Sequence, residues 1–461
     1  MKRTRLLCLT VLLLVPAFLA SAQTAVPLPG ASAAPVLTLR QAVDAALEHN
    51  PSQKLAAAGL REAQAGVHLS RSGLLPQISL SEGLTRGDDA VFAFGAKLRQ
   101  QVFGSADFSL PSLNHPAPIS DFATTLGGRW TVFDGWSTQL QIKRANLLHR
   151  SAESSASRTA QEVIFRTVAA YEAVLIATRQ AEVARHASET ARALHDLAKQ
   201  RVAAGLAVDS DELSAQVNLA QRQQELIRAE GSVQSAWAEL EAAVGTPLPM
   251  GPPSVGPLRE QSFAVAGVDA EVAVALAQRP DLDSLARQSA AQQTAVRAAR
   301  SEFSPRVDTF GSWAADRHSF GGAGGSNWMA GAELRVDLLP LQKRAQLEEQ
   351  KARLMRLEAS GEAARSTVRV EVSRAYFAQR SAAKSMEVAR DAMAQAAGSE
   401  RILRNRYDAG LVTLTEVLRA EDAGRQSQSS YWQSVYDNTL SYAALRLATG
   451  TLTADEVKNL Q

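Results

Sequence analysis

Apolar and polar residues alternate along this chain with two periods, one typical of helices and one typical of strands. Two proline-free stretches of about 68 residues, 136–203 and 341–408, are rich in Ala, Leu, Arg, Gln and Glu. A helix of that length extends ~100 Å at 1.5 Å per residue, so these stretches predict coiled-coil shafts rather than the helices of a globular domain. Shorter helices are predicted beside the shafts, over Leu39–Leu74 and Val268–Phe303, each with a second segment starting at Pro51 or Pro280, and over Asp209–Val244 and Thr413–Leu447.

Between these helices the chain alternates with the period of a strand. The stretch Asn327–Leu338 has one unbroken apolar side, and its other side carries Glu333, Arg335 and Asp337; in the first half, Arg129 lies on the polar side. Such a pattern is typical of a transmembrane β-strand with one face in lipid and one in water, whereas a soluble half-buried sheet is the alternative. The strands are predicted over Gln77–Thr85, Ala123–Phe133, Arg306–Ala315 and Asn327–Leu338.

Two stretches about half the chain apart are copies of one unit. Shifting the sequence by 205 residues places Tyr171 on Tyr376 and Arg201 on Arg406, and the register holds without a gap for about 80 residues. Duplication of so large a unit indicates a pseudo-symmetric fold rather than a short-repeat solenoid. We expect a linker over 23–36, repeat 1 over 37–245 with its strand hairpin at 77–133, a Pro-rich connector over 246–267, repeat 2 over 268–452 with its hairpin at 306–338, and a tail over 453–461.

The N-terminus predicts an exported protein. Three cations precede an apolar run from Leu6 to Leu19, and Ala20-Ser21-Ala22 offers a cleavage site, so we expect a signal peptide over 1–22. Its removal takes away Cys8, the one cysteine, and leaves 46 of the 49 basic residues against 47 acidic ones. This balance gives no reason to expect nucleic-acid binding. No later stretch is long and apolar enough to predict a transmembrane helix.

The charged strand face requires more than one copy of the chain. Four strands cannot close a barrel, and even about eight leave only a packed interior. Because the side that carries Glu333 and Arg335 needs water, the barrel must be wider than that. Several copies must therefore share one barrel, and the number of copies is left open.

The mature chain as a whole resembles the TolC family of outer-membrane efflux proteins, the exit ducts of tripartite pumps and of type I secretion systems. The resemblance rests on the duplication, on the segments Arg201–Asp211 and Arg406–Glu416 with their shared Ala-Gly-Leu, and on Leu75–Ile78 and Val132–Gly135 around the first strand hairpin. It implies a mostly α fold with a small membrane β part. In that fold, a homotrimer shares one β-barrel, with four strands from each chain, that continues into a long periplasmic α-helical coiled-coil barrel.

The Ala-Gly-Leu segments are predicted to be tight turns between helices. Gly205 and Gly410 can adopt the left-handed conformation that such a reversal needs. The resemblance implies that the turns form the periplasmic tip of the tunnel, where an adaptor docks, whereas the simpler interpretation is that they only make the turn. The predicted tip residues are Arg201, Ala204, Gly205, Leu206, Asp211, Arg406, Ala409, Gly410 and Leu411.

The residues just after each turn are candidates for an aperture. Asp209 and Thr413 are predicted to cap the returning helices. The resemblance implies acids that ring the closed aperture: Glu416 stands where the first is expected, and Arg419 where a second can occur. Asp211 takes the corresponding position in the first half. The alternative is a solvated i, i+3 pair between Glu416 and Arg419.

Together these features predict an outer-membrane exit channel with a large periplasmic portion. It would contact outer-membrane lipid and conduct substrates passively after delivery by a periplasmic adaptor (membrane fusion) protein and an inner-membrane RND or ABC transporter. The alternative is a soluble periplasmic coiled-coil scaffold or adaptor. The sequence has no nucleophile elbow, metal-ligand spacing or phosphate loop, so we expect neither enzyme activity nor a cofactor. It leaves open whether the substrate is a drug, a metal, a peptide or a protein.

Overall fold

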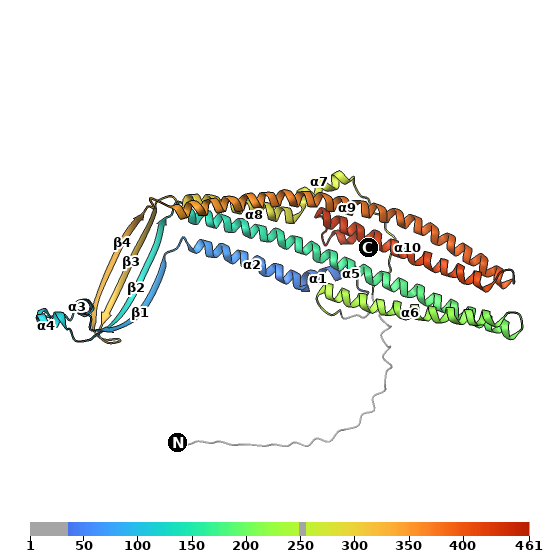
Figure 1. Cartoon of the computed structure of the whole chain (residues 1–461), viewed down its shortest axis with the longest axis horizontal. Helices are drawn as coiled ribbons and strands as arrows, with labels where there is room; N and C mark the ends of the chain where they lie inside the picture. The colour runs from blue at the N-terminus through green and yellow to red at the C-terminus, as the bar shows by residue number, and fades with distance from the viewer. Residues whose placement is uncertain (1–35, 249–254, 461) are drawn as a thin grey trace, which may run out of the picture. The chain divides into compact units, whose positions relative to one another are not determined.

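The computed structural model describes residues 36–248 and 255–460 (Figure 1). The predicted signal peptide, all of the predicted linker except Val36, and residues 249–254 of the predicted connector lie outside the described residues. All elements described here belong to the unit that starts at Leu37.

The two halves of the chain repeat one order of elements, namely two short helices, a strand hairpin, a long helix and a returning helix. The first half comprises α1 (Leu39–His49), α2 (Pro51–Ser72), β1 (Gln77–Gly87), α3 (Ala90–Arg99), η1 (Ser105–Phe108), α4 (Leu110–Asn114), β2 (Ile119–Phe133), α5 (Ser137–Ala203) and α6 (Asp209–Val244). The second half comprises α7 (Val268–Gln278), α8 (Pro280–Ser301), β3 (Arg306–Arg317), β4 (Gly324–Arg335), α9 (Leu341–Asp408), α10 (Leu414–Thr449) and η2 (Glu456–Leu460).

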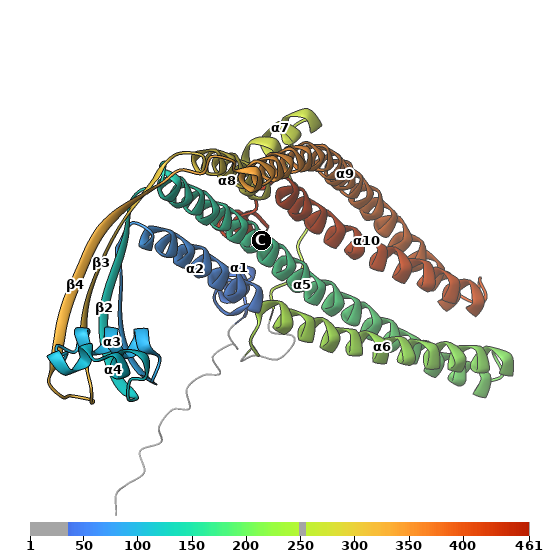
Figure 2. The ribbon, with the colours of Figure 1, turned by 60° about the vertical axis from the view of Figure 1, so that its left-hand side comes forward.

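The long helices agree closely with the prediction. They have 67 and 68 residues and pack against their returning helices as two hairpins (Figure 2). The helix α5 starts one residue later than expected because Trp136 has a left-handed φ of 70°. The predicted breaks before Pro51 and Pro280 are confirmed, and the Asn50 side chain accepts a bond from Ser52 N at 2.8 Å to cap α2.

The strands form one antiparallel sheet in the order β1-β2-β3-β4, which leaves β1 and β4 at its edges. Because α2, α5, α8 and α9 adjoin one end of the strands, the hairpin loops lie at the opposite end of the sheet (Figure 1). Several predicted boundaries are wrong. The strand β2 starts at Ile119 rather than at Ala123, and β4 runs from Gly324 to Arg335 and does not reach Leu338. Pairing stops where Arg335 meets Arg306, the first residue of β3.

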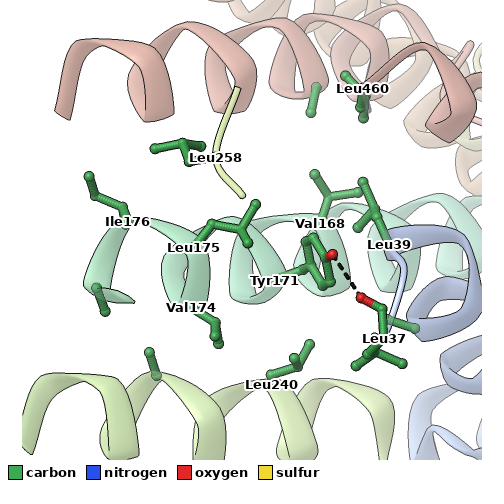
Figure 3. Close-up of a cluster of buried hydrophobic side chains, with 14 of the residues drawn as sticks. Leu37, Leu39, Val168, Tyr171, Val174, Leu175, Ile176, Leu240, Leu258 and Leu460 are labelled. Carbon is green, nitrogen blue, oxygen red and sulfur yellow. Dashed lines mark hydrogen bonds between the residues drawn. The ribbon is translucent and has the colours of Figure 1, made fainter. Parts of the chain in front are cut away.

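The main apolar core lies where α1, α5, α6 and α10 meet the C-terminal segment (Figure 3). Leu39, Val168 and Leu240 are fully buried there. The Tyr171 hydroxyl donates to Leu37 O at 2.9 Å, which ties the start of the described chain to α5. The predicted C-terminal tail joins this core, since Val457 in η2 is fully buried.

Candidate functional site

Both helical hairpins reverse through the same backbone motif. At the first turn, Gly205 N donates to Val202 O at 2.9 Å and Leu206 N donates to Arg201 O at 2.8 Å. These are the two bonds of a Schellman motif, which needs a left-handed residue. Gly205 supplies it with φ of 71°, and the same bonds recur around Gly410, whose φ is 74°. The predicted left-handed glycines are therefore confirmed.

The turns are exposed at the ends of the hairpins. Leu206 is 78% exposed and Leu411 is 73% exposed. A Cβ added at Gly205 or Gly410 would meet no atom of the described residues within 4 Å. These glycines therefore serve the backbone conformation rather than close packing, and the apolar tips are accessible to another molecule.

The two arginines that precede the turns have different surroundings. The Arg201 guanidinium lies 4.3 Å from the centre of the Tyr407 ring, and its side chain is only 23% exposed. Arg201 Nη1 also donates to Tyr407 O at 3.4 Å. Arg406, its counterpart by sequence, is exposed. Within the chain, Arg201 thus joins the first hairpin to the second.

An apolar cluster closes the seam between the hairpins next to this contact. It contains Leu194 and Ala198 from α5, Ala215 from α6, Tyr407 from α9, and Leu414 and Val417 from α10. All six side chains are buried. The ends of the two hairpins therefore share one small core.

The helix that follows the second turn has a complete capping box. Glu416 N donates to Thr413 Oγ1, and Thr413 N donates to Glu416 Oε2 at 3.0 Å. The predicted cap at Thr413 is confirmed. Glu416 forms no ion pair with Arg419 among the described residues, so the alternative interpretation of an i, i+3 pair is wrong. The carboxylate serves the cap instead, and it remains exposed.

The helix after the first turn starts differently. Its N-cap is Val208, which makes no side-chain cap bond, so the predicted cap at Asp209 is wrong. Asp209, Asp211 and Glu212 instead lie within the first turn of α6, where acidic side chains stabilise the positive end of the helix dipole.

Farther from the turns, a charged cluster bridges the returning helices α6 and α10. Arg222 is 7% exposed, and its guanidinium donates to Asp422 Oδ1 at 2.8 Å and to Glu225 Oε2 at 2.6 Å. Arg425 lies 3.8 Å from both carboxylates. Next to this cluster, burial raises the pKa of Glu421 to about 7. This cluster could not be predicted from the sequence, because Arg222 and Asp422 are 200 positions apart.

The sheet has one polar face, which the strand register defines. Glu333 pairs with Asp308, Asp308 with Thr131, and side chains of paired residues point to the same face. Arg129 and Arg335 lie on this face because they are each two residues from a member of that row. Arg335 Nη2 donates to Glu333 Oε1 at 2.7 Å, and both side chains are about half exposed.

Asp337 lies outside the paired strands, so its place on this face stays a prediction. It lies beyond the end of β4, and its carboxylate pairs with Lys343 Nζ of α9 at 2.6 Å. Three aspartates that the prediction left out do belong to this face: Asp121, Asp308 and Asp316. Their alternation with the apolar residues of β2 and β3 was a signal for them in the sequence.

The opposite face of the sheet is apolar and exposed. Trp328 is 77% exposed, Leu334 68% and Ile78 74%. Lipid is the solvent that suits such a surface next to a polar face.

Residues 36–248 and 255–460 contain neither a membrane-spanning helix nor a metal-binding cluster. No helix there combines the length and the apolar character that a membrane crossing requires. No group of three or more His, Cys, Asp and Glu side chains there is placed to hold a metal ion.

Comparison with known proteins places this architecture among channels. The family model described as "Outer membrane efflux protein" matches residues 42–246 and 272–451. The chain is 27% identical over 417 residues to Protein CyaE of Bordetella pertussis, covering 88% of this chain and 81% of that protein. It is 28% identical over 276 residues to the alkaline protease secretion protein AprF of Pseudomonas aeruginosa, covering 58% of this chain and 53% of that protein.

The fold is also similar to solved structures. The Campylobacter jejuni CmeC outer membrane channel superposes with a TM-score of 0.75 at 17% sequence identity, and the match covers 92% of this chain and 89% of that one. This likeness concerns the fold, since the identity is low.

Proposed function

The chain belongs to the outer membrane efflux protein family, and from this premise we propose that three copies of it assemble into one exit duct. The chain is an outer-membrane exit channel with a periplasmic helical tunnel. The trimer, the pore wall and the docking partners described below are our proposals. The observation that carries the shared pore is a four-stranded sheet with two edges unpaired among the described residues, one polar face and one apolar face.

The sheet edges support a barrel shared among copies. The unpaired backbone groups of β1 and β4 cannot remain exposed in lipid, where each unsatisfied group costs several kcal/mol. Pairing β4 of one copy with β1 of the next satisfies both edges and closes a barrel. In that arrangement the face with Arg129, Glu333 and Arg335 lines the water-filled lumen.

The turns support docking at the periplasmic tip. A chain anchored by its sheet in the outer membrane holds the Ala-Gly-Leu turns at the far end of its helices (Figure 1). Leu206 and Leu411 are exposed there, and we propose that a periplasmic adaptor binds them and couples the duct to an inner-membrane transporter. Glu416 and Arg419, exposed after the second turn, are the proposed aperture residues.

The proposed cargo rests on the name of one relative. AprF is named a secretion protein, and this favours an exported protein over a small molecule as the cargo. Comparing the proteins in the medium of cells with and without this chain tests the choice. Unchanged secreted proteins together with a new sensitivity to toxic compounds contradicts it and favours small-molecule efflux.

Cysteine pairs across the two sheet edges test the assembly. One cysteine is placed along β1, at Ser79, Ser81 or Gly83, and one along β4, at Met329 or Gly331, all on the polar face. We expect at least one pair to yield covalent dimers and trimers under oxidation, recovered from the outer membrane. Cysteines at Ser81 and Thr125, which pair within the chain, should cross-link without joining copies. Recovery of the chain in the soluble periplasmic fraction contradicts the proposal and favours the scaffold alternative.

A further inference from the structure

The loop of the first strand hairpin is a folded unit that packs against the polar face of the sheet. Residues 88–118 connect β1 to β2 and contain α3, η1 and α4. The helix α3 contacts β2, β3 and β4, and Figure 2 shows it beside the loop end of the sheet. The loop of the second hairpin spans only residues 318–323.

Arg99, the last residue of α3, bonds to two strands at once. Its Nη2 donates to Asp121 Oδ2 of β2 at 3.3 Å, and its Nε donates to Asp316 Oδ1 of β3 at 3.2 Å. The two aspartates are only 4% and 3% exposed. Without the guanidinium they would be two buried negative charges on neighbouring strands, which is strongly unfavourable. Arg99 therefore fixes the loop to this face.

The next two residues strengthen the attachment. Gln100 is 2% exposed, and its amide donates to Asp121 Oδ1 and to Ser120 O, both at 2.9 Å. Gln101 has a left-handed φ of 58°, a strained conformation for a residue with a side chain. A Cβ on Gly325 of β4 would clash with Arg99 O, so β4 also approaches this segment closely.

The rest of the loop has its own interior. The rings of Phe94 and Phe103 lie 4.5 Å apart, and those of Phe103 and Phe108 lie 5.1 Å apart. Lys97 Nζ pairs with Asp107 Oδ1 at 2.7 Å. A loop with aromatic packing, an internal ion pair and a buried anchor keeps one position, unlike a solvated connection.

We propose that residues 88–118 form a size-selecting constriction at the outer mouth of the channel, held against the pore wall by Arg99. This inference rests on the proposed function, which makes the polar face the lumen wall. Asp121, Asp316 and Gly325 all lie on that face, so the anchored segment is on the lumen side. It is at the loop end of the strands, opposite the end that adjoins the long helices α5 and α9, and hence at the outer end. One such segment from each copy narrows the mouth.

A single cysteine inside the barrel tests this mouth, because a reagent added outside the cell reaches it through the mouth and need not pass through the periplasmic tip. Ser312 lies on the polar face in the middle of β3, opposite Gly127 and Met329. The chain has only one natural cysteine, Cys8, which lies in the predicted signal peptide. In intact cells carrying Ser312→Cys, the labelling rates of a small impermeant maleimide and of a bulky polyethylene-glycol maleimide are measured from outside.

With the natural loop we expect fast labelling by the small reagent and slow labelling by the bulky one. Arg99→Ala should raise the rate of labelling by the bulky reagent several-fold and leave the rate for the small reagent unchanged. Replacing residues 90–117 by a short Gly-Ser segment should raise the rate of labelling by the bulky reagent further. The matched control is Arg86→Ala. Arg86 lies at the loop end of β1 but on the apolar face of the sheet, and its Nη1 donates to Ser120 Oγ at 3.2 Å. Its loss should change neither labelling rate.

Two results overturn the inference in different ways. If the small reagent labels Ser312→Cys but the loop replacement does not speed the bulky reagent, the channel stands and the constriction is wrong. If assembled outer-membrane protein is labelled by neither reagent in any variant, the polar face is not the lumen wall. That result contradicts the proposed function as well. The amount of heat-dissociable oligomer, measured for every variant, shows that each has assembled.

Discussion

The guanidinium of Arg201 lies 4.3 Å from the centre of the Tyr407 ring, across the seam between the two helical hairpins. The 205-residue register does not repeat this contact, because Arg406 occupies the place of Arg201 and Val202 the place of Tyr407. The same holds in the neighbouring core, where Leu414 and Val417 of the second hairpin correspond to Asp209 and Glu212 of the first. The order of elements is thus duplicated along the chain. The contacts that join the two hairpins are not duplicated, because each uses a residue type that the other repeat lacks at the corresponding position.

Loss of the Tyr407 ring should loosen the tips. Tyr407→Leu removes a cation–π contact of about 0.5–2 kcal/mol and part of the shared core. Tyr407→Phe keeps the ring and the core and serves as the control. We expect faster proteolysis at the turns 204–206 and 409–411 for the leucine variant only, measured on the detergent-purified protein. Equal rates for both variants contradict a role for the ring.

A side chain at Gly205 should strain the turn without a clash. Gly205→Ala places a Cβ in the left-handed region at a cost of roughly 1–2 kcal/mol, although the space around it is open. We expect normal assembly but weaker capture of the adaptor, measured by co-purification. Gly231→Ala in the middle of α6 is the control, and it should raise helix stability by about 0.5–1 kcal/mol. Full adaptor capture by Gly205→Ala and by a bulkier Gly205→Val would contradict docking at this turn.

A side chain at Gly245 should instead block folding of the repeat. This glycine ends α6 with φ of 86°, and an added Cβ would lie 2.8 Å from Asn50 Cα and 2.9 Å from His49 O. The left-handed strain of roughly 1–2 kcal/mol is then joined by an overpacking cost of about 1–3 kcal/mol. Heat-dissociable oligomer should be clearly lower for Gly245→Ala than for Gly205→Ala. A larger amount of oligomer for Gly245→Ala than for Gly205→Ala would contradict this, because it would show that the backbone at this junction moves freely enough to avoid the clash.

The parts of the fold that local pattern determines were predictable. A helix of 68 residues, a left-handed glycine and a strand alternation are each visible within a short window, so α9, both turns and the polar face of the sheet agree with the prediction. The end of β4 was misplaced because the alternation continues past Arg335 while the partner strand does not.

The contacts that join distant segments could not be predicted. Arg99 lies 217 positions from Asp316, and Arg222 lies 200 positions from Asp422. The sequence around Arg222 resembles any solvated helix with mixed charge, and the sequence of α3 around Arg99 contains no acidic partner. Only the folded chain shows that Arg99 lies next to two buried carboxylates and that Arg222 is itself buried beside its carboxylate partners.

Stability should depend on pH through Glu172. Burial in α5 raises its folded-state pKa from 4.5 to about 8. Between these values the unfolded chain releases a proton that the folded chain keeps, so this group lowers stability as the pH rises from about 4.5 to about 8, by up to about 1.4 kcal/mol per pH unit. Above pH 8 its effect is constant. Thermal unfolding of the wild type should show this fall, and Glu172→Gln should reduce it. An equal slope in both proteins contradicts the buried neutral carboxyl.

Glu416 offers a test of the aperture that leaves the helix cap in place. Glutamine at this position can still accept the bond from Thr413 N, so Glu416→Gln removes the charge and keeps the capping box. We expect weaker block of the single-channel current by divalent cations. Glu387→Gln, an exposed carboxylate of α9 paired with Lys384, should leave the block unchanged. A block equal to that of the wild type would leave Glu416 as a capping residue only.

The shared, water-filled barrel is tested most directly by single-channel recording from the purified full-length chain in a planar lipid bilayer. The account predicts stepwise ionic currents from heat-stable oligomers, and no current after heating has dissociated them. Correctly folded oligomers that insert into the bilayer and carry no current would contradict it. So would a chain that purifies only as a soluble monomer.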